Sequence, residues 1–327
     1  MISLQSLKLY EKSSTCGKRP GFALPHRVTM PAMFSYRHAF HAGNHADVLK
    51  HLTLIATLRH LMLKDPAILL VDTHAGAGLY RLDGDYAEKS GEAADGIQKL
   101  QAAFPDGQGP TALADYLACV AAVNPSGSRQ VYPGSPFIMQ QLMRYESRDR
   151  LKLFELHPTD HKTLSGNIAQ LEAGREISVQ MQDGFEALRA LLPPPVSASG
   201  SRRACVLMDP SYELKSDYAR VVDSIQDCLT RFATGTYLVW YPIIGRTEAH
   251  DLPRRLKALC TPLKKSWLHA TLAIGRGGED SAGLNASGMF IINPPYTLAA
   301  QLKETLPVVL KALGRGVGQS QSVETGQ

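Results

Sequence analysis

The pattern of apolar positions takes two forms along the chain. Short apolar-rich segments of strand length occur at 68–72, 151–155, 177–181, 204–209, 237–242, 268–274 and 289–293. Between them, apolar residues recur every three or four positions, which is typical of helices with one buried face. The first and fourth segments do not alternate, which indicates central strands covered by helices on both faces. The chain is therefore predicted to have an α/β fold with a mostly parallel sheet.

The first strong helical pattern follows Asn44, a good N-cap, and has Asp47 in its first turn, where the helix dipole favours an acid. Apolar residues then recur at helical spacing as far as Met62, which predicts a helix with one face in the core. Four histidines fall in or just before this segment: His38, His41, His45 and His51. No cysteine or carboxylate accompanies them in a ligand pattern, so no metal site is predicted.

The remaining patterns predict the domain organisation. Residues 1–32 mix Ser, Lys, Pro and Gly without a period, which favours a disordered N-terminal extension. Residues 33–313 carry the main domain, and alanine-rich helical patterns from about 82 to 130 predict a helical subdomain inserted into it. The main pattern resumes near Tyr132, where Ser135 as N-cap and a following proline predict the start of a helix. Residues 314–327 are predicted to be a flexible C-terminal tail.

Acidic residues stand at the ends of successive predicted strands. The first strand runs into Asp72 and a small-residue turn with Gly76 and Gly78, where the backbone can approach a ligand closely. The second ends in Glu155, the usual place for a carboxylate that binds the ribose hydroxyls of an adenosine cofactor. The third is followed by Asp183-Gly184, where a side-chain oxygen and a backbone N–H can read an adenine edge. Three such acids in succession indicate a nucleotide-type cofactor site.

The fourth strand ends in Asp209-Pro210-Ser211-Tyr212. An exocyclic amine on a nucleobase is a poor nucleophile, so a site that uses it must accept its protons. The carboxylate of Asp209 and the carbonyl of Pro210 can both accept hydrogen bonds from one amino group, and Tyr212 is predicted to stack on the base. This is the Asp-Pro-Pro-Tyr pattern of amino-methyltransferases, with Ser211 in place of the second proline. Asn293-Pro294-Pro295-Tyr296 resembles a related motif, but it follows the seventh strand, so Asp209 is preferred.

Composition and charge narrow the class of protein. The chain has 327 residues, of which 44% are hydrophobic and 20% charged, as in ordinary globular proteins. It has no apolar run of transmembrane length and no secretory signal pattern, so a cytoplasmic location is expected. Five widely spaced cysteines suggest neither disulfides nor a zinc site. The net charge of +5 permits a nucleic-acid partner without requiring one.

From Met33 to about Leu313 the chain resembles the RlmJ family of bacterial 23S ribosomal RNA adenine-N6 methyltransferases. The motifs that carry the resemblance are SYRHAFHAGNHADVLKH, DTHAGAGLY, YPGSP, ELHP, DGF, DPSYE, RFATGTYLVWYP and ASGMFIINPP. The resemblance implies a Rossmann-like class I fold and S-adenosylmethionine as cofactor. It also implies 23S ribosomal RNA as partner, with no membrane and no metal, and we expect a monomer.

The resemblance also implies roles for particular residues. Asp209 would be the catalytic acceptor for the adenine amino group and would lie beside the cofactor, with Lys50 nearby. Tyr36 and His38 would close over the cofactor and the target base. The remaining cofactor contacts would be His51, His74, Ser135, Glu155, Asp183 and Gly184.

Three alternative functions stay open at the level of sequence. A DNA adenine-N6 methyltransferase would use the same chemistry. A nicotinamide oxidoreductase shares the fold and Glu155, but Arg81 stands where the dinucleotide fingerprint has its third glycine. A cofactor-binding RNA module without activity would result if Ser211 had abolished turnover.

Overall fold

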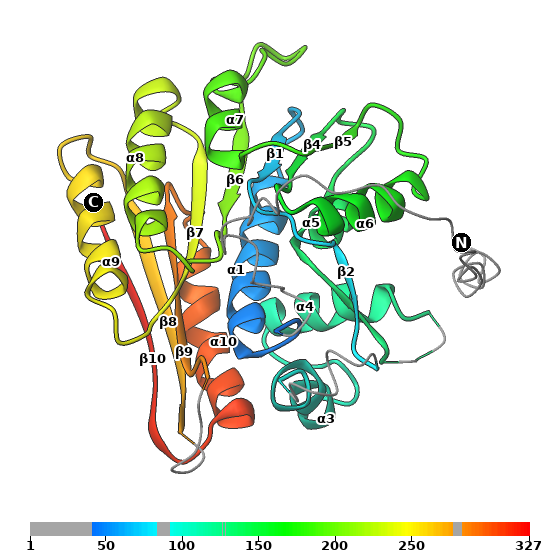
Figure 1. Cartoon of the computed structure of the whole chain (residues 1–327), viewed down its shortest axis with the longest axis vertical. Coiled ribbons are helices and arrows are strands. Elements are labelled where there is room, and N and C mark those ends of the chain that lie inside the picture. The colour runs from blue at the N-terminus through cyan, green and yellow to red at the C-terminus, as the bar shows by residue number, and fades with distance from the viewer. Residues whose placement is uncertain (1–40, 84–91, 126, 128, 277–282) are drawn as a thin grey trace, which may run out of the picture. The chain divides into compact units, whose positions relative to one another are not determined.

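The computed structural model describes residues 41–83, 92–125, 127, 129–276 and 283–327. Its centre is an eight-stranded sheet (Figure 1). The strands are β1 (Leu69–Asp72), β4 (Arg150–Phe154), β5 (Ile177–Gln180), β6 (Ala204–Met208), β7 (Thr236–Pro242), β8 (Trp267–Arg276), β9 (Ala286–Ile292) and β10 (Val317–Gly326). All seven predicted strands are present, and the predicted α/β class is confirmed.

The order of strands places the functional edge of the sheet. The spatial order is β10-β8-β9-β7-β6-β1-β4-β5, and β5, β4, β1, β6 and β7 are mutually parallel. From β1 the chain builds one half of the sheet through β4 and β5, then crosses to β6 on the other side of β1. In open α/β sheets, ligands bind at the carboxyl ends of the strands beside such a change of direction. The ends of β1, β4 and β6 are therefore the expected site.

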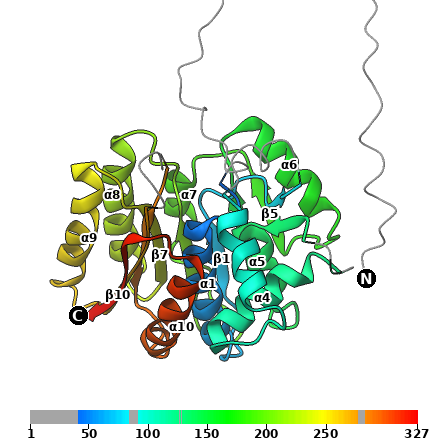
Figure 2. The ribbon, with the colours of Figure 1, turned by 90° about the horizontal axis from the view of Figure 1, so that it is seen from below.

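Both faces of the sheet are covered by helices (Figure 2). Cys205 and Leu207 of β6 face one core, which also holds residues of α1 (His45–Leu61), α4 (Thr111–Ala122), α5 (Ser135–Leu142), α6 (Pro158–Ala169) and α10 (Leu298–Leu313). Val206 and Met208 face a second core with α7 (Gly184–Leu191), α8 (Ser216–Arg231) and α9 (Thr247–Cys260). Every position of β6 is buried, which is why its sequence is apolar without alternation.

Helix α1 is buried on more sides than its sequence predicts. Asn44 caps it as predicted, accepting hydrogen bonds from the N–H groups of Ala46 and Asp47. All residues from His45 to Leu58 are buried, because α1 packs against the sheet, α4, α5 and α10 together. Polar side chains that a one-sided helix would show to water therefore lie inside the domain. Such groups need partners within the protein.

The inserted segment contains a short π-helical turn, η3 (Ala94–Gln98), α3 (Lys99–Ala103) and α4. A two-stranded antiparallel ribbon, β2 (Leu79–Arg81) with β3 (Val131–Pro133), joins the two ends of the insertion to each other. The helical character is as predicted, and the ribbon was missed because strands of three residues leave little periodicity. The ribbon returns the chain to α5 beside β1.

The prediction for the C-terminal residues was wrong. The flexible tail expected at 314–327 instead forms β10, which pairs antiparallel with β8 along its length. Its sequence is mainly Gly, Ser, Gln and Thr, so the backbone ladder determines the strand and not an apolar face. Near the surface, Arg203 donates to the carbonyl of Pro66 at 2.6 Å and to that of Leu61. Together with Arg144 it satisfies carbonyl groups at the end of α1.

Asn293 has a structural environment, as its position after the seventh strand suggests. Its backbone is in the left-handed region with φ of 52°, and its side-chain amide donates to the carbonyls of Ala233 and Gly235 at 3.0 and 2.7 Å. Asn is among the few residues that tolerate this conformation.

We predict that Asn293→Ala lowers the free energy of unfolding by roughly 1–3 kcal/mol, because it leaves two carbonyls without their donor and strains the backbone. Chemical denaturation measures the loss. The matched variant Asn285→Ala removes an amide that donates to the carbonyl of Gly283, two residues away, and should change stability little. Equal stability of the two variants would contradict this assignment.

Candidate active site

The predicted acids converge at the carboxyl ends of the parallel strands. In the sheet register Asp72 lies opposite Leu153 of β4 and Leu207 of β6. Glu155 and Asp209 each lie two residues beyond these partners, so the three carboxylates come from adjoining strands at one edge. Asp183 follows β5 at the same edge. The arrangement is the one that the sequence predicts.

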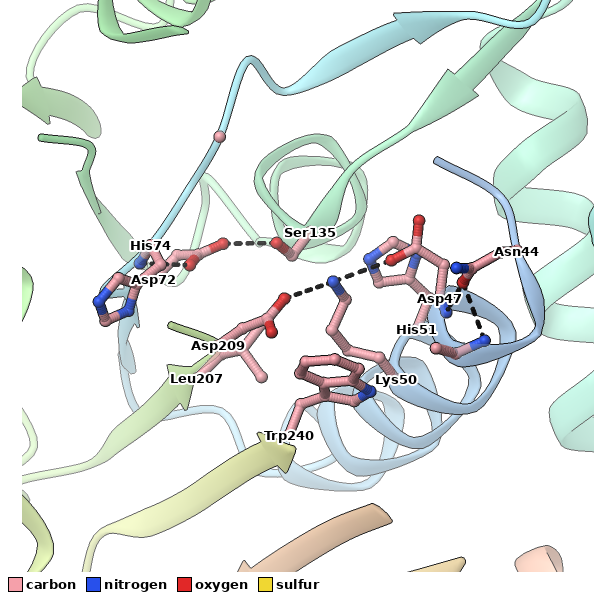
Figure 3. Close-up of polar contacts among 12 residues, drawn as sticks. Asn44, Asp47, Lys50, His51, Asp72, His74, Ser135, Leu207, Asp209 and Trp240 are labelled. Carbon is pink, nitrogen blue, oxygen red and sulfur yellow. Dashed lines mark hydrogen bonds and ion pairs between the residues drawn. The ribbon is translucent and has the colours of Figure 1, made fainter. Parts of the chain in front are cut away.

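Asp209 forms an ion pair with a lysine from α1 (Figure 3). Lys50 Nζ lies 2.5 Å from Asp209 Oδ2 and 2.9 Å from Asp47 Oδ1, and it lies 5.8 Å from the ring centre of Trp240. The side chains of Lys50 and Asp47 are almost completely buried, whereas that of Asp209 is 13% exposed. Burial lowers the pKa of the Lys50 ammonium, but the two carboxylates outweigh burial, so its pKa is raised and Lys50 stays charged.

The loop that carries Asp209 is held at Tyr212. The Tyr212 hydroxyl donates to the carbonyl of Trp240 at 2.6 Å, and Arg246 donates to the carbonyls of Tyr212 and Glu213 at 2.8 and 3.3 Å. The backbone of Tyr212 has a positive φ of 54°, a conformation that residues other than glycine seldom adopt. These contacts fix the turn without the second proline, because they hold the residue that follows Ser211.

The predicted stacking of Tyr212 on a base is not supported. The Tyr212 side chain is buried, and its ring packs 4.6 Å from that of Tyr218 and 6.1 Å from that of Trp240. The aromatic ring therefore anchors the loop from inside the second core. Pro210 is buried as well, and Ser211 is exposed.

Asp72 organises the turn after β1. Its carboxylate accepts a hydrogen bond from Ser135 Oγ at 2.6 Å and one from the N–H of His74 at 3.2 Å. Burial raises the pKa of Asp72 to about 6, although both hydrogen bonds oppose that shift. Ser135 was predicted to be the N-cap of its helix. Instead α5 begins at Ser135 with Gly134 as N-cap, and the hydroxyl is engaged with Asp72.

His74 is held in a neutral form at the same turn. Burial lowers its pKa to about 4, more than the nearby carboxylates raise it. Its Nδ1 lies 2.8 Å from the Thr73 hydroxyl, and its ring meets that of Phe185 edge to face at 4.9 Å. A neutral imidazole fixed in this way can offer a hydrogen bond or an apolar face to a ligand.

Glu155 and the glycine turn hold each other. The Glu155 carboxylate accepts hydrogen bonds from the N–H groups of Gly76 and His157, both at 2.7 Å. Gly76 and Gly78 have φ of 59° and 81°, which glycine adopts without strain. Burial raises the pKa of Glu155, and the two N–H donors oppose that shift. Each carboxylate oxygen still has a lone pair with which to accept a hydroxyl.

Asp183 and Gly184, which follow β5, have structural roles in addition to the predicted contact with an adenine edge. Asp183 caps α7 through the N–H groups of Phe185 and Glu186, and its second oxygen lies 2.5 Å from the Arg220 guanidinium. Burial raises the pKa of Asp183, but Arg220 and the cap outweigh burial and lower it. Gly184 is indispensable for packing, because a Cβ there would lie 2.1 Å from the carbonyl oxygen of Thr73. The start of α7 thus touches the end of β1.

His51 points into a set of buried aromatic hydroxyls. Its Nδ1 lies 2.7 Å from the hydroxyl of Tyr132, which lies 3.1 Å from that of Tyr116 on α4. The two other predicted site residues, Tyr36 and His38, lie outside the described residues. Within the described part of the chain, no group of three metal-ligating side chains comes together, and no helix is long and apolar enough to cross a membrane.

Three residues of the site were missed from the sequence. Asp47 was interpreted only through the helix dipole, although its place three residues before Lys50 puts both on one face of α1. Trp240 and Arg246 come from β7 and the loop after it, and only the tertiary fold brings them to Lys50 and Tyr212.

Comparisons with known proteins agree with this geometry. Residues 65–324 match the family model described as "RsmJ: Ribosomal RNA large subunit methyltransferase D, RlmJ". A Haemophilus influenzae protein named "Ribosomal RNA large subunit methyltransferase J" is 42% identical over 282 residues, which cover 86% of this chain and 94% of that protein. The Escherichia coli protein of the same name is 42% identical over 275 residues, covering 84% and 92%.

Among solved structures, a Legionella pneumophila protein is similar over most of its length. It is 31% identical, with a TM-score of 0.76, and the match covers 88% of this chain and 98% of that one. The similarity thus extends over most of both chains.

We predict that Arg246→Ala loosens the loop that carries Asp209. Hydrogen bonds from a charged donor contribute about 1.5–3 kcal/mol, so the amides near Tyr212 should exchange with deuterium at least about tenfold faster. Hydrogen–deuterium exchange with peptide resolution measures this. Lys215→Ala is the matched control, because Lys215 follows the same loop but is mostly exposed and pairs only with Glu248 on the surface. Unchanged exchange in Arg246→Ala would show that the loop is rigid for another reason.

Proposed function

This chain belongs to the RlmJ family of ribosomal RNA large subunit methyltransferases, and on that premise we propose that it methylates the N6 amino group of an adenine in 23S ribosomal RNA, with S-adenosylmethionine as methyl donor. It is a methyltransferase, so the oxidoreductase reading is set aside. The single observation that carries the proposal is the buried pairing of Asp209, at the end of the fourth strand of the sheet, with Lys50.

The residues at the strand ends fit an adenosine cofactor. Glu155 is oriented by two backbone N–H groups and keeps lone pairs for a pair of ribose hydroxyls. The glycines of the turn after β1 let a ligand approach the backbone, and Gly184 begins α7, so its N–H has no partner within the helix. We propose that these residues hold S-adenosylmethionine together with His51, His74, Ser135, Asp183 and Asp209. When bound, this cofactor supplies an electrophilic methyl group.

Asp209 and Pro210 then serve the nucleophile. Lys50 contacts Asp209 through Oδ2, so Oδ1 can accept a hydrogen bond from the adenine amino group. The carbonyl of Pro210 supplies a second acceptor, and the two together orient the nitrogen lone pair. Positioning of this kind accounts for much of the rate in an in-line displacement.

Lys50 places a fixed positive charge beside the acceptor. Its raised pKa keeps it an ammonium in contact with Oδ2 of Asp209. The amine loses its proton after it gains the methyl group, so Asp209 need not be a strong base before transfer. Proton release through Asp209 to water completes the reaction.

The RNA must present its target base outside the stack, since an adenine within a helix cannot reach Asp209. A net charge of +5 is compatible with contacts to phosphates. Tyr36 and His38 stay assigned, by the resemblance alone, to closing over the base and the cofactor. A ribosomal RNA substrate is also the basis for expecting the protein in the cytoplasm.

We predict that Asp209→Ala lowers the rate of methyl transfer to a 23S ribosomal RNA transcript by about 10²–10⁴-fold, because the amine loses its acceptor. Nuclease digestion and mass spectrometry of the product measure N6-methyladenine. Asn293→Ala, at the similar motif after the seventh strand, should keep its activity at a temperature where it is folded.

The proposal would be overturned by near-normal turnover of Asp209→Ala. A duplex DNA with adenine sites tests the alternative substrate, and faster methylation of that DNA than of the transcript would replace ribosomal RNA as the substrate.

A further inference from the structure

Asp47 is the second carboxylate at Lys50, and its two oxygens face different donors (Figure 3). Its Oδ1 lies 2.9 Å from Lys50 Nζ, and its Oδ2 accepts a hydrogen bond from the N–H of Gly43 at 2.9 Å. The Asp47 side chain is 1% exposed. Both oxygens thus accept from donors inside the protein, as expected of a carboxylate and not of a neutral carboxyl group.

Lys50 is therefore shared by two carboxylates. Its Nζ also lies 2.5 Å from Oδ2 of Asp209, so the three side chains together carry one net negative charge. A pair formed by Lys50 and Asp209 alone would be neutral. Asp47 is the residue that makes the difference, although nothing in the proposed reaction requires it to touch the substrate.

The proposed reaction places a positive charge on the target amine. The N6 nitrogen forms a bond to the methyl carbon, and the carbon–sulfur bond breaks with its electron pair on sulfur. The nitrogen then stays cationic until its proton leaves through Asp209 to water. A positive charge that develops in a water-poor site is stabilised by a negative charge already in place. One ammonium between two carboxylates leaves such a charge beside the amine.

We propose that Asp47 is a positioning residue that holds the Lys50 ammonium on Oδ2 of Asp209 and so leaves Oδ1, with its negative charge, to the target amine. The effect on the reaction rests on the proposed function, whereas the hold on Lys50 does not. Without the Asp47 carboxylate, the whole ammonium charge would act on Asp209, and Lys50 could turn its donors to both oxygens. The amine would then compete with Lys50 for its acceptor.

Asp47 is itself oriented from the inserted segment. The carbonyl of Gly43 accepts a hydrogen bond from the N–H of Ile97 in η3 at 2.7 Å. Gly96 packs so closely there that a Cβ would lie 2.1 Å from the same carbonyl oxygen. The peptide groups of Gly43 are therefore fixed, and its N–H directs the Asp47 carboxylate toward Lys50. The inserted segment thus supports the acceptor at the end of β6 through two residues of α1.

A double-mutant cycle between Asp47 and Lys50 tests the hold on Lys50 in the full chain without any ligand. We expect Asp47→Asn to raise the equilibrium constant for unfolding at least about tenfold, because asparagine has one acceptor oxygen and no charge for the buried ammonium. In a Lys50→Met background the same change should leave that constant unchanged or lower it, because it removes a buried carboxylate that has lost Lys50. Chemical denaturation measures all four proteins.

An equal rise in both backgrounds would make Asp47 a structural residue that acts only through the helix and Gly43, and would overturn the proposal. If Asp47→Asn does not fold on its own, the comparison of Lys50→Met with the double variant still decides. A structural role predicts a further loss of stability in the double variant, and the hold on Lys50 predicts none.

Methyl transfer to a 23S ribosomal RNA transcript tests the effect on the acceptor. At a temperature where it is folded, Asp47→Asn should have a kcat about tenfold below that of wild-type protein. The KM for the transcript and the Kd of S-adenosylhomocysteine should each change by less than about twofold, because Asp47 acts on Asp209 and not on binding.

Asp149→Asn is the matched control for the rate. Asp149 is also completely buried, accepts from a backbone N–H, that of Ile68 at 2.9 Å, and pairs with Arg144 at 3.0 Å. It lies at the amino ends of β1 and β4, away from the site, so its loss should lower stability and leave kcat unchanged. A kcat of Asp47→Asn equal to that of Asp149→Asn would overturn the proposal. If wild-type protein does not methylate the transcript, the proposed function fails, and the denaturation cycle still decides whether Asp47 holds Lys50.

Discussion

The buried ion pair between Lys50 and Asp209 is the contact on which the site depends. It joins α1, the first helix of the described chain, to the end of β6, 159 positions later. Burying either charge alone would be costly, so each residue requires the other to be in place. Asp47 and the ring of Trp240 complete the surroundings of the ammonium. Lys50 on α1 thus contacts residues of two neighbouring strands, Asp209 just after β6 and Trp240 on β7.

Much of this architecture can be predicted from the sequence, because the spacing of apolar residues and the residues that begin or end helices and strands are local properties. The apolar strands, the cap at Asn44 and the acids after each strand were all visible, and counting strands separated Asp209 from Asn293. What was missed depends on contacts between distant segments. The strand β10 exists because β8 offers it a backbone ladder, and the Tyr212 ring is buried because Tyr218 and Trp240 surround it.

The serine in the Asp-Pro-Ser-Tyr motif shows how one constraint can be replaced by another. A second proline would restrict the turn through its own ring. Here the turn is restricted from outside, through the Tyr212 hydroxyl and the Arg246 guanidinium. The inserted segment is also connected to α1, since the Tyr116 hydroxyl lies 3.1 Å from that of Tyr132, which lies 2.7 Å from His51 Nδ1.

The C-terminal strand also bears on how the protein behaves at high concentration. β10 is the edge strand of the sheet and covers the hydrogen-bonding edge of β8. Strand β8 itself contains the buried residues Leu268, Leu272 and Ile274. An open edge beside such residues would be a template for aggregation. β10 takes over the edge with a sequence of Gly, Ser, Gln and Thr, which presents polar side chains to any approaching chain. Colloidal stability is therefore tied to the pairing of β10, and a mutation that frees this strand would be expressed first as loss of solubility, with the methyl-transfer site still intact.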